Sequence, residues 1–236
     1  MLRLRQIAFA ATDLAAAERA LIHALGLRLC YRDPNVAVFG LRNALFPVGD
    51  QFLEIVSPVE PGTTAGRLLD KRGGDCGYMV LFQTAELAPV ERRIAEAGIR
   101  VVFDAKGDGI RGLHLHPRDV PGAIVSIDAA AEPAAWPWAG PNWREHVETS
   151  TVSAIVALDV AVTDPRAACA RWGHVLGVNP EGDHLVVDDG VVRFVDANAH
   201  PRGEGIVAIT YATRDLELIG SSQELLGVSI RFVAAG

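Results

Sequence analysis

One carboxylate stands inside an otherwise apolar run of this sequence: Glu54, in the segment FLEIVSPV at residues 52–59. The branched side chains and the closing proline predict a buried strand. A glutamate is almost never fully buried unless another group pairs with it. A buried carboxylate with hydrogen-bond donors around it can act as a general base when burial raises its pKa. Glu54 is therefore the candidate catalytic residue.

A second group of reactive side chains lies in the segment RGLHLHPRD at residues 111–119. His114 and His116 are two residues apart, so they share one face of a predicted strand, and this spacing can bind a metal ion. His116 and Arg118 could instead meet an anionic group of a ligand. A third interpretation is that the two histidines only stabilise a hairpin at the protein surface.

The composition narrows the classes of protein. Half of the 236 residues are hydrophobic and the net charge is −7, which indicates a packed protein and gives nucleic acid no basic patch to bind. No apolar run reaches the roughly 18 residues that a membrane span needs. Asp13 interrupts the apolar N-terminal segment, so we expect no signal peptide and a cytoplasmic location. Three scattered cysteines predict free thiols.

An internal repeat organises the chain. Residues 10–27 (AATDLAAAERALIHALGL) and 161–178 (AVTDPRAACARWGHVLGV) share a Thr-Asp pair and a Leu-Gly pair at the same spacing. Thr or Asp caps a helix N-terminus, and glycine commonly ends a helix. Weaker copies at 77–103 and 206–233 also predict strand, helix, glycine and strand. The sequence therefore predicts four units, at about 4–58, 76–128, 152–196 and 205–233.

The first unit continues beyond its helix with three predicted strands, at 36–39, 43–49 and 52–59, which gives the order β-α-β-β-β. The fourth unit lacks the last strand pair. We therefore divide the chain into a module pair with a ligand pocket (1–128), a connector (129–150) and a degenerate, truncated second module pair (151–236). The connector holds three of the four tryptophans. We expect them to anchor it, or one of them, Trp143, to close over a ligand pocket.

Paired β-α-β-β-β units with these motifs resemble the vicinal oxygen chelate superfamily, which includes glyoxalase I, extradiol dioxygenases, methylmalonyl-CoA epimerase and bleomycin-resistance proteins. The segments QIAFAATDL, ALGL, FLEIVSPV and HPRDVPGAIVSID carry the resemblance, which is closest to the glyoxalase-like branch. It implies an α+β fold in which repeated βαβββ modules form a half-barrel around a pocket.

Members of this superfamily typically bind a divalent metal through His, Glu or Gln, His and Glu. The matching positions here are Gln6, Glu54, Tyr78 and Ser126. This set lacks both imidazoles, and hydroxyl groups are poor ligands near neutral pH, so its departure from the family pattern predicts a pocket without a metal or other cofactor. Gln6, Tyr78 and Ser126 would then donate hydrogen bonds around Glu54. A metal site rebuilt from Glu54, His114 or His116 and Asp128 stays open as an alternative.

The resemblance implies a protein that binds a small organic molecule. Our first hypothesis is a lyase or isomerase that acts on a carbonyl or thioester substrate, with Glu54 as the base. Tyr78, Gln6 and Arg118 would stabilise the developing enolate. The alternatives are a resistance-type protein that sequesters its ligand, and a metal-dependent enzyme with substitute ligands. We also expect a homodimer, because an open half-barrel leaves strand edges unpaired.

Overall fold

The computed structural model describes all 236 residues and contains two β-sheets. The first sheet has seven strands in the order β2-β3-β1-β4-β7-β6-β5. They are β1 (Leu2–Ala10), β2 (Leu41–Val48), β3 (Gln51–Pro58), β4 (Cys76–Thr84), β5 (Val101–Gly107), β6 (Ile110–Leu115) and β7 (Ile124–Ala130). The second has six strands in the order β12-β13-β11-β8-β10-β9. They are β8 (Ala154–Val162), β9 (His184–Val187), β10 (Gly190–Asp196), β11 (Gly205–Thr213), β12 (Ser222–Leu225) and β13 (Val228–Ala234).

The strand pairing confirms the repeated module. In every module the opening strand runs parallel to the closing strand: β1 beside β3, β4 beside β7, β8 beside β10, and β11 beside β13. The closing strand also pairs antiparallel with the strand before it. The fold is therefore α+β, as the sequence predicts.

Two helices begin and end where the repeat predicts, α1 (Leu14–Leu25) and α4 (Pro165–Leu176). The Asp13 carboxylate accepts a hydrogen bond from a backbone N–H of the first turn of α1 at 3.1 Å, and Asp164 does the same for α4 at 3.0 Å. Gly26 and Gly177 end the helices with φ angles of 68° and 74°, a conformation that favours glycine.

Two predictions about local structure are wrong. Residues 36–39 do not form a strand but lie in a 3₁₀ helix, η1 (Pro34–Phe39), because the Asp33 side chain caps its start and Gly40 ends it in the left-handed region. The helix predicted within residues 206–233 is absent, because residues 216–220 form turns and are followed by β12 (Ser222–Leu225). Leu216 is 83% exposed, so this short segment has no buried apolar face to hold a helix.

The remaining helices are α2 (Thr64–Arg72), α3 (Ala88–Glu96) and the 3₁₀ segments η2 (Pro137–Ala139), η3 (Trp143–His146) and η4 (Ala197–Ala199). None of the helices combines the length and apolar character needed to cross a membrane.

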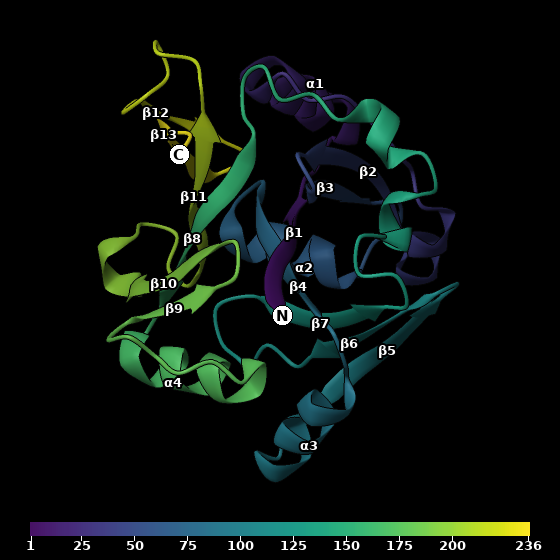
Figure 1. Ribbon diagram of the computed structural model, residues 1–236, viewed down its shortest axis with the longest axis vertical. Helices are drawn as coiled ribbons and strands as arrows, with labels where there is room; N and C mark the ends of the chain where they lie inside the picture. The colour runs from purple at the N-terminus through teal and green to yellow at the C-terminus, as the bar shows by residue number, and fades with distance from the viewer. The chain divides into compact units, whose positions relative to one another are not determined.

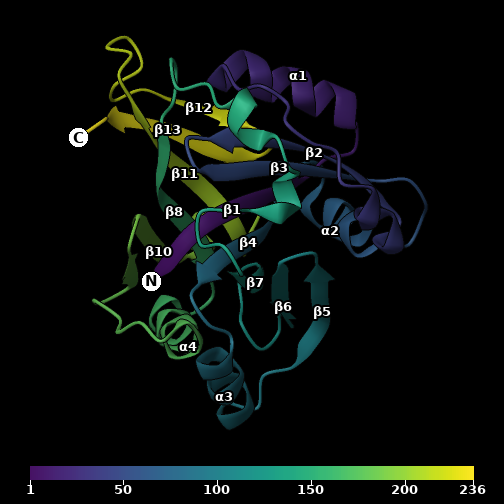
Figure 2. The same ribbon diagram turned by 45° about the vertical axis from the view of Figure 1, so that its right-hand side comes forward.

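The chain forms two compact units, each assembled from three segments. The first consists of Met1–Arg5, Met79–Pro137 and Ala157–Val207. In it α3 and α4 lie side by side (Figure 1 and Figure 2). Arg93 of α3 donates to a carbonyl at the end of α4 at 2.8 Å, and Arg171 of α4 donates to a carbonyl just past the end of α3 at 3.2 Å. Each arginine thus places positive charge at the other helix's C-terminus, where the helix dipole favours it.

The second unit consists of Gln6–Tyr78, Trp138–Val156 and Ala208–Gly236. Helix α1 packs against β2 and β3, and α2 packs against β3 (Figure 1). The buried side chains of α1 recur at helical spacing: Leu14, Ala17, Leu21 and Leu25. This packing fixes β3, the strand that carries Glu54.

Two tryptophans of the connector are buried. In the first unit, the guanidinium of Arg5 lies 5.6 Å from the ring centre of Trp136. In the second unit, Trp143 meets Phe52 edge to face, with 4.9 Å between the ring centres. Contacts of this kind are typical of anchoring aromatic residues. The division of the chain at residues 128 and 150 stays a prediction.

Candidate functional site

Glu54 is the centre of a small polar cluster on β3. One carboxylate oxygen accepts a hydrogen bond from the Gln6 amide nitrogen at 2.9 Å, and the other accepts from the Asn43 amide nitrogen at 2.6 Å. The strand register explains why these three side chains meet, because Gln6 on β1 and Asn43 on β2 both pair with residues two positions from Glu54. Side chains two positions apart on a strand share a face.

Glu54 is 8% exposed, and its environment sets its charge. Burial raises the pKa of Glu54 to about 7, because a carboxylate loses its hydration inside the protein. The hydrogen bonds from Asn43 and Gln6 act in the other direction, and the negative charge of Asp33 adds to the rise. Near neutral pH this carboxyl group can therefore both accept and return a proton.

Tyr78 is the second ionisable side chain of the cluster. It is only 8% exposed, and its hydroxyl has no hydrogen-bond partner within the protein. Burial raises its pKa to about 12, with a further rise from the charge of Glu54 and a decrease from Arg67. Tyr78 is therefore a neutral phenol near pH 7 and has a proton to donate.

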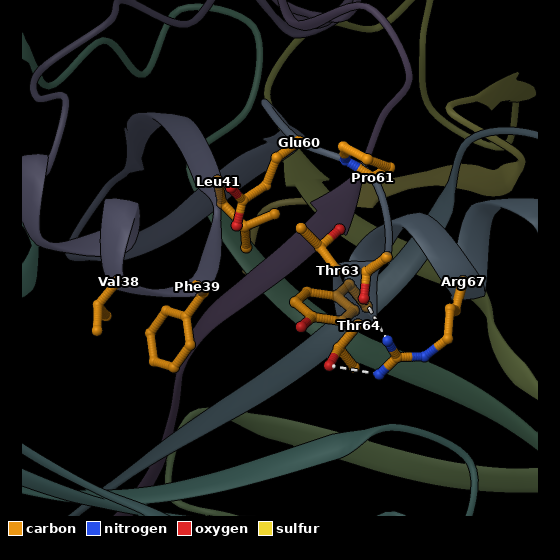
Figure 3. Close-up of a pocket in the computed structure, with 10 residues that line it drawn as sticks. Val38, Phe39, Leu41, Glu60, Pro61, Thr63, Thr64 and Arg67 are labelled. Carbon is orange, nitrogen blue, oxygen red and sulfur yellow. Dashed lines mark hydrogen bonds between the residues drawn. The ribbon is translucent and has the colours of Figure 1, made fainter.

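Tyr78 lines a cavity of about 330 Å³ that lies wholly within the second unit (Figure 3). The wall comes from η1, the start of β2, the loop after β3 and the first turn of α2. Its residues are Val38, Phe39, Leu41, Glu60, Pro61, Gly62, Thr63, Thr64, Arg67 and Tyr78. Figure 3 shows Phe39 on the side of the cavity opposite Arg67. The volume suits a small organic molecule.

A separate polar cluster lies in the first unit. Ser126 donates its hydroxyl proton to the carboxylate of Asp128 at 2.7 Å, and both side chains are fully buried. Gln83 pairs with Asp128 in register, and His114 pairs with Ser126, so all four side chains lie on one face of the sheet. Burial lowers the pKa of His114 to about 4, and its ring lies 5.5 Å from that of Phe103. This histidine is neutral at pH 7.

The other two predicted residues of the segment at 111–119 follow the end of β6. The Nδ1 atom of His116 accepts a hydrogen bond from the backbone N–H of Arg118 at 3.1 Å. The Arg118 side chain is exposed. Trp143 packs on Phe52 and does not line the cavity. Glu54 does not line it either, and Tyr78 is the residue that connects the Glu54 cluster with the cavity.

The predicted donors thus separate into groups. In the structure Gln6 donates a hydrogen bond to Glu54, and Tyr78 lies close enough for the charge of Glu54 to raise its pKa. The proton of Ser126 goes to Asp128 instead. The roles predicted for Ser126, His114, His116, Arg118 and Trp143 in ligand binding stay predictions.

The sequence alone did not reveal Asn43 or Arg67. Asn43 lies in a predicted strand, but only the β2–β3 register shows that its amide reaches Glu54. Arg67 belongs to α2, which the repeat does not predict. The segment TTAGRLLDKRGG at 63–74 carries the usual signals of a helix, a threonine cap and a glycine stop, and could have been found on that basis.

The donor set around Glu54 does not fit the divalent metal that the superfamily usually binds. Both carboxylate oxygens accept amide N–H groups, and Gln6 turns its nitrogen rather than its oxygen toward Glu54. Transition metals prefer imidazole, thiolate or carboxylate ligands. No group of three or more His, Cys, Asp or Glu side chains is arranged to hold a metal ion.

The equivalent position in the second sheet carries an ion pair. Arg193 of β10 pairs in register with Asp159 of β8, just as Glu54 of β3 pairs with Ala8 of β1. The side chains of Arg193 and Asp159 are 3.2 Å apart. The buried carboxylate with amide donors therefore occurs in the first module and is replaced in the third.

Paired βαβββ modules, with parallel opening and closing strands, define the vicinal oxygen chelate fold. The family model of the glyoxalase-like domain matches residues 7–176, which is more than half of the chain. The chain therefore belongs to the glyoxalase-like domain family of the vicinal oxygen chelate superfamily. A search of curated proteins finds no significant match.

Solved structures share the fold. A hypothetical protein from Staphylococcus aureus matches with a TM-score of 0.74 and 13% identity, covering 100% of both chains. A variant of methylmalonyl-CoA epimerase from Streptomyces coelicolor, in complex with 2-nitronate-propionyl-CoA, matches with a TM-score of 0.50 and 24% identity. That match covers 55% of this chain and 98% of the epimerase. At these identities the likeness establishes the fold and leaves the reaction to the site.

Proposed function

We propose that this chain is a lyase or isomerase that removes a proton next to a carbonyl or thioester group, with Glu54 as the base and without a metal. One observation carries the proposal: a buried carboxyl group with a pKa of about 7, fixed by two amide donors. A general base works best when its pKa lies near the working pH.

The proposed step uses two side chains. The ionised Glu54 takes the proton from the carbon beside the carbonyl, and the electron pair of that C–H bond moves toward the carbonyl oxygen. The neutral Tyr78 donates a hydrogen bond to the resulting enolate oxygen. Glu54, now protonated, returns the proton to carbon or to a leaving group. Asn43 and Gln6 act as positioning residues, because they hold the carboxylate and contact no reacting atom in this scheme.

The cavity favours this proposal over sequestration of an aromatic compound. A stacking binder needs several aromatic walls. No tryptophan lines the cavity, and Phe39 and Tyr78 are its aromatic residues. The similarity to an epimerase that binds a coenzyme A thioester agrees with carbon-acid chemistry but does not identify a substrate. The cytoplasmic location and the homodimer remain part of the same proposal.

Proton exchange provides the test. Small ketones, oxo acids and acyl thioesters are incubated with the protein in D₂O, and the loss of the C–H signal is followed by proton NMR. We expect exchange of at least one class, and Glu54→Gln should slow that exchange by about 100-fold or more. Glu217→Gln removes an exposed carboxylate from the same unit and serves as the control. Full exchange by Glu54→Gln, or binding without exchange, would refute the proposal.

A further inference from the structure

The cavity wall carries an arginine whose guanidinium is held in place by neutral oxygens. Arg67 donates to the Gly62 carbonyl and, at 3.1 Å, to the Thr64 hydroxyl oxygen (Figure 3). Neither partner neutralises its charge. A guanidinium has five N–H groups in a planar fork that matches the oxygens of a carboxylate or phosphate. Arg67 is therefore oriented at the cavity with N–H groups still available.

Two hydroxyl groups beside Arg67 are also available as donors. The Thr63 oxygen accepts a hydrogen bond from the Gly66 backbone N–H at 2.9 Å, and the Thr64 oxygen accepts from Arg67. Each hydroxyl keeps its hydrogen for another acceptor. The wall near α2 thus presents a cation and two hydroxyl donors to one volume.

Tyr78 supplies an independent observation in the same cavity. Its side chain is more than nine-tenths buried, yet its hydroxyl has no partner within the protein. The hydroxyl oxygen is not one of the fully buried polar atoms that lack a partner, so it keeps accessible surface toward the cavity, where a ligand or water can pair with it. The cavity is the space that this hydroxyl shares with Arg67.

The cavity wall also carries a negative charge from Glu60, an exposed residue of the loop after β3. Glu60 lines the cavity, and its carboxylate lies over Gly40, where an added Cβ would come within 2.4 Å of one of its oxygens. Any side chain at Gly40 would displace it. An anionic ligand group would therefore be attracted by Arg67 and repelled by Glu60.

We infer that the cavity binds the oxyanion of a small organic ligand, a carboxylate or a phosphate, through Arg67, Thr63 and Thr64, with the ligand's carbonyl oxygen toward Tyr78. The inference rests on the proposed function, because it names the class of substrate for the same site. That class is a carbonyl compound or thioester that carries its own negative charge. Arg67 is then a specificity-determining residue rather than the base.

A matched pair of ligands tests the inference. We would titrate 2-oxobutanoate and its neutral analogue 2-butanone, with inorganic phosphate as a third probe, by ligand-observed NMR. The oxo acid should bind at least about tenfold more tightly than the ketone. Arg67→Gln should remove this preference, whereas Arg42→Gln, which removes an exposed arginine outside the cavity wall, should keep it. Binding of phosphate that also depends on Arg67 would identify phosphate as the preferred source of the oxyanion.

Two further variants separate this inference from the proposed function. Glu60→Gln should tighten binding of the acid, because it removes a negative charge from the cavity wall. Glu54→Gln should mainly slow proton exchange, because Glu54 acts on the proton. If Arg67→Gln abolishes the preference while Glu54→Gln retains exchange, the inference stands and the proposed function fails. Equal binding of the acid and the ketone would overturn the inference. It would also be overturned if anion binding, tested up to about 10 mM, were the same in Arg67→Gln as in the wild type.

Discussion

Replacing Glu54 by glutamine should change how the stability of the protein depends on pH. The pKa of Glu54 rises from 4.5 in the unfolded chain to about 7 in the folded protein, chiefly because of burial. One pKa unit corresponds to about 1.4 kcal/mol, so ionisation of Glu54 lowers the free energy of unfolding by about 3 kcal/mol.

The sign follows from the direction of the shift. Between pH 4.5 and about 7 the folded protein holds a proton on Glu54 that the unfolded chain has released. The contribution of Glu54 to stability is thus complete below pH 4.5 and is lost as the pH rises through 7. A glutamine at this position does not titrate. The free energy of unfolding of Glu54→Gln, relative to that of the wild type, should therefore increase by about 3 kcal/mol between pH 4.5 and pH 8.

Urea unfolding followed by tryptophan fluorescence, at several pH values from 4.5 to 8, measures this difference. The amide groups of Asn43 and Gln6 must rearrange around the new side chain, but that cost does not depend on pH. The change of the difference with pH, rather than its absolute value, is therefore the test. Glu217→Gln, on the surface of the same unit, controls for the loss of a charge. A difference that stays flat across this range would refute the reasoning.

Two further predictions concern packing in the first unit. In Gly112→Ala the new Cβ would lie 2.0 Å from a carboxylate oxygen of the buried Asp128, so we expect a loss of about 1–3 kcal/mol in urea unfolding. An unchanged midpoint would contradict this. Arg171→Ala removes hydrogen bonds to two backbone carbonyls and should cost about 1.5–3 kcal/mol, whereas Arg166→Ala, exposed on the same helix, should cost less than about 0.5 kcal/mol.

Much of the fold could be predicted from the sequence because its signals are local. The caps at Asp13 and Asp164 and the glycine stops at Gly26 and Gly177 satisfy helix ends with neighbouring residues. The two wrong predictions, the strand at 36–39 and the helix within 206–233, concern short segments in which an apolar pattern competes with turn residues. At residues 36–39 the left-handed conformation of Gly40 ends a 3₁₀ helix, so the segment does not form a strand.

The site could be predicted only in part because it depends on strand register. The burial of Glu54 and the nearness of Gln6 followed from alternation along two strands and from the resemblance. The contact with Asn43 required the pairing of β2 with β3, which fixes Asn43 opposite Val56. The cavity depends on α2 and η1, and neither belongs to the repeated pattern. Ser126 lies at the position expected from its motif, but its hydrogen bond to Asp128 reflects a partner two residues along its own strand.

Metal content tests the central claim most directly, because it needs no substrate. Protein purified without a tag or a chelator would be analysed by elemental mass spectrometry, together with Glu54→Ala. We predict far less than one divalent metal ion per chain in both proteins, since two amide N–H groups occupy the carboxylate of Glu54. Near-stoichiometric metal in the wild type that is lost in Glu54→Ala would contradict it and would assign Glu54 as a metal ligand.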